Sequence, residues 1–238
     1  MKKLAAAIFG LLGTTGFAAP GAAQAPAPYP VMAPLEQYLI PDRAAEIALA
    51  RSAAPPSISA DAEILVLGSD GYERAAAGTN GFTCLVERSW FAGLNDPGFW
   101  NPRVRGPDCY NRQAARSVLP TYLMRTRWVL AGISQREISE RTHAAMAAGQ
   151  IRAPEIGSMN FMLSRRGYLG DGPRGPWRPH LMFFMPRMAV SDWGSGLPGV
   201  PVLNAVDAGV DPYTLFFVPV AIWSDGSPVD QAGGRHDM

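Results

Sequence analysis

Histidine and carboxylate side chains are the groups of this sequence that could perform acid–base chemistry. Of the three histidines, His180 opens an apolar segment, PHLMFFMP. Imidazole has an ordinary pKa near neutrality, so His180 is a candidate general base of a hydrolase-type enzyme. Its candidate carboxylate partners are Glu87, Asp192 and Asp225. The alternative for His180 is a polar tip at a sheet margin, because Tyr213 takes its place where the segment recurs.

The three carboxylates also have structural interpretations. Glu87 and Arg88 are neighbours, so on a strand they face opposite sides and at least one of them is covered. A covered charge needs a partner, which favours a structural ion pair at this position. Asp192 and Asp225 each follow a serine and lie within two residues of a tryptophan. Turn formation explains this pattern, and a sugar-binding site is the alternative.

Arginines cluster in the middle of the chain. Between residues 103 and 127 there are six arginines against one aspartate. Guanidinium groups bind phosphate or carboxylate through paired hydrogen bonds, which suggests an anion-binding segment. The alternative is a solvated face whose arginines pair with acids elsewhere. The candidate residues for anion binding are Arg103, Arg105, Arg112 and Arg116.

The two cysteines, Cys84 and Cys109, are 25 residues apart. In an oxidising compartment such a pair predicts a disulfide, whereas two buried thiols or a reactive thiol are the alternatives. No further cysteine or histidine stands at metal-ligand spacing, so no metal site is expected. Motifs for phosphate, dinucleotide or zinc binding and the nucleophile-elbow motif are also missing, so we expect no cofactor.

The first 25 residues have the order typical of a secretory signal peptide. Lys2 and Lys3 precede an apolar run, Leu4–Leu12, and small residues follow. This run is too short for a bilayer span, which predicts a periplasmic or secreted protein without a transmembrane anchor. Without its two lysines the chain carries 19 arginines against 20 acids, so nucleic acid is not an expected partner.

The remaining sequence predicts one α+β domain over residues 42–228, with an antiparallel or mixed sheet and about three helices. A Pro/Ala-rich arm precedes it over 26–41, and a disordered polar tail follows over 229–238. Helices are expected within 41–54, within 111–132 with a kink or break at Pro120, and within 134–149. The last of these begins with a capping box, SQRE.

Six segments have the apolar patterns of strands. PHLMFFMPRMAVSD and PYTLFFVPVAIWSD share six of fourteen positions at an offset of 33. Both are apolar on either face, which predicts two core strands in a covered sheet, and an internal duplication is the alternative. The expected strands are Ile64–Leu67, Phe82–Trp90, Met159–Leu163, the two Phe-Phe segments and Val200–Val206.

The runs GTNGFTCLVERSW, AARSVLP and PHLMFFMP resemble a family of exported bacterial proteins of unassigned function. The resemblance spans most of the chain and implies secretion and a shared domain, but no activity. Two functions are therefore expected from the residues alone. The first is a non-enzymatic cell-envelope protein that binds a small molecule or an envelope component, and the second is the hydrolase-type enzyme based on His180.

Overall fold

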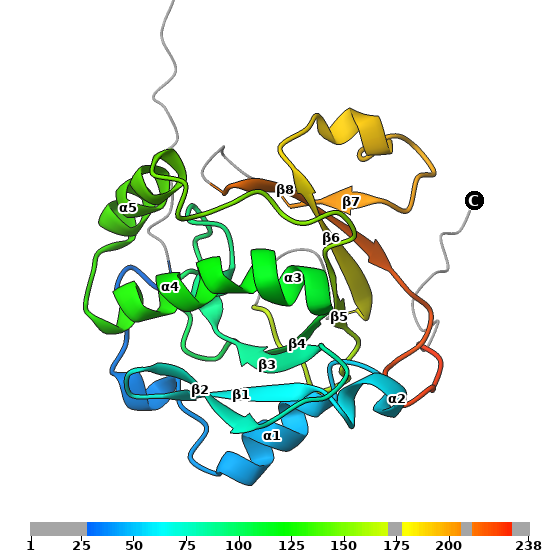
Figure 1. Cartoon of the computed structure of the whole chain (residues 1–238), viewed down its shortest axis with the longest axis horizontal. Coiled ribbons are helices and arrows are strands. Elements are labelled where there is room, and N and C mark those ends of the chain that lie inside the picture. Colours follow the sequence, from blue (N-terminus) through cyan, green and yellow to red (C-terminus); the bar gives the residue numbers. More distant parts are fainter. Residues whose placement is uncertain (1–27, 171–177, 206–210, 230–238) are drawn as a thin grey trace, which may run out of the picture.

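The structure is a computed structural model that describes residues 28–170, 178–205 and 211–229. The predicted signal peptide and all but the first residue of the predicted polar tail lie outside these ranges. One mixed sheet of eight strands organises the fold, in the order β2-β1-β3-β4-β5-β6-β8-β7 (Figure 1). Only β1 and β3 are parallel neighbours, and the other pairs are antiparallel. The predicted single α+β domain is confirmed.

The strands are short and follow one another mostly in chain order. Their order departs from the chain order at β2 and at β7, which form the two edges of the sheet. The eight strands are β1 (Glu63–Gly68), β2 (Gly71–Ala76), β3 (Thr83–Glu87), β4 (Gly106–Tyr110), β5 (Met159–Met162), β6 (His180–Pro186), β7 (Leu203–Asn204) and β8 (Tyr213–Pro219).

In the part of the chain that the structure describes, three of the five α-helices are nine residues or longer. The α-helices are α1 (Arg43–Arg51), α2 (Pro56–Ser59), α3 (Arg112–Ser117), α4 (Leu119–Leu130) and α5 (Gln135–Ala147). Three short 3-10 helices accompany them: η1 (Leu35–Gln37), η2 (Ser89–Phe91) and η3 (Val190–Trp193). Within the described residues, no helix has the length and apolar content needed to cross a bilayer.

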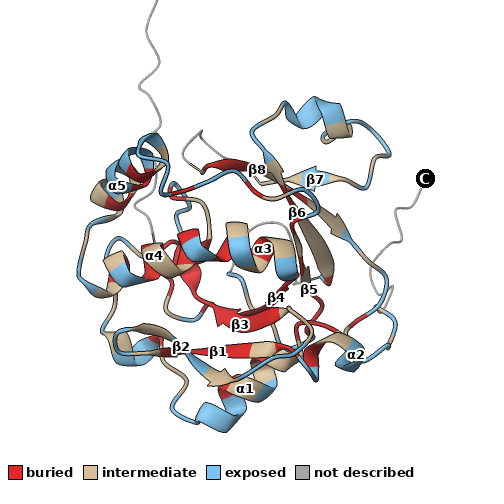
Figure 2. Cartoon of the chain, viewed as in Figure 1, coloured by how far each residue is buried: buried red, intermediate tan, exposed pale blue. Residues whose placement is uncertain are grey.

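Both faces of the central strands are covered. Helix α1 packs on one face, where Ala50 contacts a cluster that includes Ile64 and Val86. Helices α3 and α4 pack on the other face, where Tyr122 belongs to a larger aromatic cluster. Strands β3 and β4 are buried at every position (Figure 2). Any polar side chain on these two strands must therefore find its partner inside the protein.

The predicted helix boundaries follow their capping residues. The Asp42 carboxylate accepts from the N–H groups of Ala44 and Ala45 at the start of α1. The Ser134 hydroxyl accepts from the Glu137 N–H at the start of α5. Pro120 divides the predicted helix at 111–132 into α3 and α4, because proline lacks an N–H and fits only the first turn of a helix.

Two features of the central strands differ from the sequence prediction. The strand expected over Phe82–Trp90 ends at Glu87, and η2 follows, so Arg88 and Trp90 lie beyond the strand. Strand β4 is not among the strands expected from the sequence. Its sequence, GPDCY, contains glycine, proline and aspartate, which are depleted in strands, and burial on both faces overrides that preference.

The two Phe-Phe segments become β6 and β8, which are antiparallel neighbours. Phe183 pairs with Phe216, and Phe184 pairs with Leu215. One face contributes Phe184 to the core beneath the helices, and on the other face Phe216 stacks on Trp193 of η3. Both segments form strands inside the sheet, as predicted, but most of their residues are only partly buried. The shared environment as the cause of the recurrence stays a prediction.

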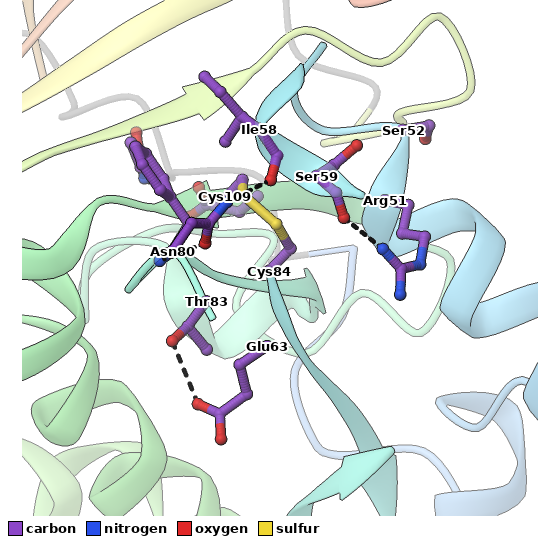
Figure 3. The surroundings of a disulfide bond; sticks show 12 residues. Arg51, Ser52, Ile58, Ser59, Glu63, Asn80, Thr83, Cys84 and Cys109 are labelled. Atoms are coloured by element: carbon purple, nitrogen blue, oxygen red, sulfur yellow. Dashed lines mark hydrogen bonds between the residues drawn. A yellow bond between two sulfur atoms is a disulfide. The ribbon is translucent and has the colours of Figure 1, made fainter. Parts of the chain in front are cut away.

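The predicted disulfide joins Cys84 of β3 to Cys109 of β4. These residues lie directly opposite one another in the antiparallel pair, and both are fully buried. Figure 3 shows the bond beside α1 and α2. The closed loop contains the long segment that joins β3 to β4, so the bond reduces the conformational freedom of the unfolded chain.

Removing the disulfide should reduce the stability of the domain. For a loop of 25 residues the expected loss in the free energy of unfolding is about 3.5 kcal/mol. Urea unfolding of the Cys84→Ala/Cys109→Ala variant should measure this loss. Reductant should lower the midpoint of the wild type to that of the variant and leave the variant unchanged. An unchanged midpoint in the variant would contradict the stabilising role.

Candidate functional site

His180, the candidate general base, lies at the start of β6 on the face covered by α3 and α4. It pairs with Met162, and the β4–β5 register places Asp108 opposite Met162 on the next strand. Neighbouring strands lie about 4.8 Å apart, so the backbones of His180 and Asp108 are separated by about 10 Å. The His180 Nδ1 lies 2.8 Å from the Arg178 carbonyl oxygen, so Nδ1 carries the hydrogen in the neutral ring. Burial lowers the pKa of His180.

Glu87, the second candidate, belongs to a buried polar cluster on β3, β4 and β5. The Tyr110 hydroxyl donates to Glu87 Oε1 at 3.0 Å, and the Asn160 amide donates to Asp108 Oδ2 at 2.7 Å. The carboxyl groups of Glu87 and Asp108 also lie within hydrogen-bonding reach of each other. Asp108 and Asn160 are fully buried, and Glu87 is nearly so. The cluster brings two carboxyl groups, a phenol and an amide together away from water.

Burial changes the ionisation of this cluster. Desolvation raises the pKa of Glu87 and raises the pKa of Asp108 well above its ordinary value. The negative charge of Glu87 raises the pKa of Asp108 further, whereas hydrogen bonds from Asp108 and Tyr110 oppose the rise at Glu87. Asp108 therefore holds a proton more readily than Glu87. Burial also raises the pKa of Tyr110, so its phenol remains neutral.

The other two candidate carboxylates lie on separate surface segments. Asp192 is exposed in η3, next to the tryptophan that stacks on Phe216. Asp225 is in a turn after β8, where it accepts from the Ser227 N–H and hydroxyl. Its Oδ2 lies 3.7 Å from Arg165 Nε. The Ser227 hydroxyl bond is the main cause of the lowered pKa of Asp225. The predicted turn chemistry is confirmed at Asp225.

The four candidate anion-binding arginines contact different parts of the protein. Arg103 lies over the Tyr168 ring, Arg112 approaches the Asn80 carbonyl, and Arg116 pairs with Glu155. Arg105 donates to four carbonyl oxygens, including those of Gln37 and Leu39. Burial lowers the pKa of Arg105 to about 10, so it remains charged at neutral pH. Each guanidinium thus has a structural contact of its own, and anion binding stays a prediction.

The ion pair expected near Glu87 and Arg88 forms between Arg88 and a residue of α1. Arg88 Nη2 lies 2.8 Å from Glu46 Oε1, with both side chains buried. Arg88 also donates to the Tyr38 carbonyl oxygen, and Glu46 accepts from the Leu67 N–H. This ion pair joins the N-terminal arm, α1, β1 and the end of β3. Its complete burial and full set of partners indicate a structural role.

A second place where polar groups from several segments meet is an open hollow beside α1 and α2. Its volume is about 340 Å³, which falls within the range of small-molecule sites. Arg51 stands at the end of α1, and its Nη1 donates to the carbonyl oxygens of Ser59 and Ala60 (Figure 3). The hollow is lined by Ala48, Arg51, Ser52, Ala54, Pro56, Ser59, Ala60, Ser224 and Asp225.

Sequence reasoning did not select Asp108, Tyr110, Asn160 or Arg51. A signal for two of them was available, because residues on either side of a cross-strand cysteine point to the opposite face of the strand. The disulfide at Cys109 therefore implies that Asp108 and Tyr110 point together into the other layer. No local pattern marked Arg51, since the hollow is formed by segments far apart in the chain.

Comparison with known proteins found no matching family model, no matching curated protein and no matching solved structure. The functional interpretation therefore depends on the residues themselves.

Breaking the buried ion pair should strongly destabilise the protein. Arg88→Met leaves the Glu46 carboxylate buried without its cation, for which the expected loss in the free energy of unfolding is about 3–5 kcal/mol. The double variant Arg88→Met/Glu46→Leu should recover part of this loss because no unpaired charge remains. Thermal and urea unfolding measure both effects.

Arg136→Met provides the control for this experiment. Arg136 pairs with Glu140 on the exposed surface of α5, and the expected change is below about 0.5 kcal/mol. A loss at Arg88 no larger than the loss at Arg136 would show that the buried pair is not required.

Proposed function

We propose that this is an exported, non-enzymatic binding protein that holds a small amphipathic anion in the hollow beside α1 and α2. The observation that carries the proposal is the meeting of α1, α2 and the turn after β8 around a space of about 340 Å³. Helices α1 and α2 supply apolar walls and the cationic Arg51, and the turn after β8 adds Ser224 and Asp225. Such a combination is typical of small-molecule sites.

The chemistry of the hollow favours a ligand with an apolar part and an anionic group. Ala48, Ala54 and Pro56 offer apolar surface. The Arg51 hydrogen bonds to the carbonyl oxygens of Ser59 and Ala60 use only Nη1, which leaves the N–H groups of Nε and Nη2 for a ligand. Because Nη1 is fixed, the guanidinium is already oriented before an anion binds.

Binding is favoured over hydrolysis by the positions of the candidate catalytic carboxylates. Glu87 is engaged with Tyr110 and Asp108 in the buried cluster, and Asp225 is engaged with Ser227 in a surface turn. Asp192 lies on a third element, η3. A general base needs an oriented partner and a reacting group in one concave site. The hollow contains Asp225 but neither His180 nor Glu87 among its lining residues.

Fluorescence titration with 8-anilinonaphthalene-1-sulfonate, which combines apolar rings and a sulfonate, tests the proposal. The wild type should bind the dye, and Arg51→Met should bind it at least roughly tenfold more weakly, because a charge-assisted hydrogen bond contributes about 1.5–3 kcal/mol. Ala48→Trp should fill the hollow and abolish binding. Thermal unfolding of each variant verifies that it is folded.

Ala45→Trp is the matched control, because Ala45 is also exposed on α1 but does not line the hollow. It should bind the dye as the wild type does. Equal affinities for the wild type, Arg51→Met and Ala48→Trp would place the dye elsewhere and refute the proposed site.

Export is the second part of the proposal. Its support is the order of charged, apolar and small residues over the first 25 positions, together with the buried disulfide of the domain. Disulfides persist in the periplasm and outside the cell, whereas cytosolic thiols are kept reduced. An exported location would therefore match the chemistry that the domain requires.

The intact mass of the full chain expressed in a Gram-negative host tests export. Periplasmic protein should lack about the first 25 residues and contain oxidised cysteines. Ile8→Arg should interrupt the apolar run, keep the chain at full length in the cytosol and leave both thiols reduced. Val31→Arg is the control, since Val31 is 71% exposed in the arm. Wild-type protein that retains Met1 in the cytosol would refute export.

A further inference from the structure

Glu87 and Asp108 would place two negative charges side by side if both were ionised, and the surrounding side chains do not neutralise them. Glu87 lies opposite Gly106 and Asp108 lies opposite Leu85, so the two side chains are diagonal neighbours on one face of the sheet. Their carboxyl groups hydrogen-bond each other in the buried layer. The neighbouring donors reach Glu87 Oε1 and Asp108 Oδ2. Asp108 Oδ1 is buried and has no hydrogen-bond donor. Two ionised carboxylates in this arrangement would repel each other without compensation.

We propose that Glu87 and Asp108 share one proton in the folded protein and form a buried acid–carboxylate pair that makes the domain more stable as the surroundings become more acidic. The proton supplies the donor that is otherwise missing between the two groups. It resides mainly on Asp108, whose O–H donates to the Glu87 carboxylate. Tyr110 and Asn160 complete the pair by donating to its remaining sides.

The groups around the pair do not supply the missing positive charge. Arg88, which directly follows Glu87, is paired with Glu46 at 2.8 Å, and Arg125 of α4 is paired with Asp211 at 2.6 Å. Burial raises the pKa of every tyrosine in the layer, so these phenols stay neutral. The titratable groups that interact with the pair are Tyr72 of β2, Tyr110 of β4 and Tyr122 of α4. Arg88 and Glu46 lie beside Tyr72, whereas Arg125, Asp211 and Tyr213 lie beside Tyr122. His180 lies on β6, two strands from Asp108.

The direction of the pH effect follows from proton linkage. The pKa of Asp108 is raised on folding, so the folded state retains a proton that the unfolded state releases above about pH 4. This contribution to stability is complete below the unfolded pKa and falls as the pH rises toward the folded pKa. Surface ion pairs with lowered carboxylate pKa values, such as that of Glu155, have the opposite dependence.

The Asp108→Asn variant lacks the group that binds this proton. The difference between its unfolding free energy and that of the wild type therefore reports the proton's contribution. An asparagine amide can donate to Glu87 without binding a proton and can still accept from Asn160. As the pH rises above the unfolded pKa of about 4, the unfolding equilibrium constant of the wild type should rise relative to that of the variant, by up to about tenfold per pH unit while folded Asp108 keeps its proton. Asp192→Asn, an exposed substitution on η3, should leave the pH dependence of the wild type unchanged.

Two further measurements decide the question if Asp108→Asn does not fold. Glu87→Gln should also remove the pH-dependent difference, because its amide donates to an ionised Asp108. Infrared difference spectra of the wild type at neutral pH should contain the carbonyl band of a protonated carboxylic acid, since exposed carboxyl groups are ionised there.

Either of two results would overturn the proposal. In the first, the ratio of the unfolding equilibrium constants of the wild type and Asp108→Asn does not change with pH, and the wild type has no carboxylic acid band. The other is a wild type whose thermal midpoint rises with Mg²⁺ or Ca²⁺ while that of Glu87→Gln does not. That result would mean that a cation, not a proton, neutralises the pair.

Discussion

Burial of β3 and β4 on both faces is the constraint on which the rest of this structure depends. With α1 on one side and α3 and α4 on the other, polar groups on these strands have no access to water. Each polar group must therefore be matched within the protein, at a cost of several kcal/mol if it is not. The Glu87–Asp108 pair on β3 and β4 and the Arg88–Glu46 pair directly after β3 meet this requirement. The disulfide joins the same two strands.

The same constraint separates structural chemistry from chemistry available to a ligand. The carboxyl groups with the most altered pKa values lie in the sealed layer beneath α4 and serve the fold. Perturbed ionisation often marks a functional site, but it does so only where a cleft gives a substrate access. The hollow beside Arg51 differs from this sealed layer because a ligand can reach it. Its charged groups, Arg51 and Asp225, line a space that is open to solvent.

Much of the architecture could be predicted from the sequence because it depends on local signals. Asp42, Pro120 and Ser134 fixed the starts of three helices, and the apolar Phe-Phe segments identified two interior strands. Strand β4 escaped prediction because its residues are poor strand formers that are held in place by their neighbours. The disulfide could be predicted from two cysteines, whereas the partner of Arg88 could not. Glu46 lies 42 residues away, and only the packing of α1 against the sheet brings them together.

The position of the disulfide has a consequence for how the sheet is assembled. Cys84 and Cys109 face each other across an antiparallel pair, and a slip of one residue would turn one sulfur toward the opposite layer. Once formed, the bond therefore disfavours a pairing of the third and fourth strands that is shifted by one residue. The covalent bond restricts strand register as well as the freedom of the unfolded chain.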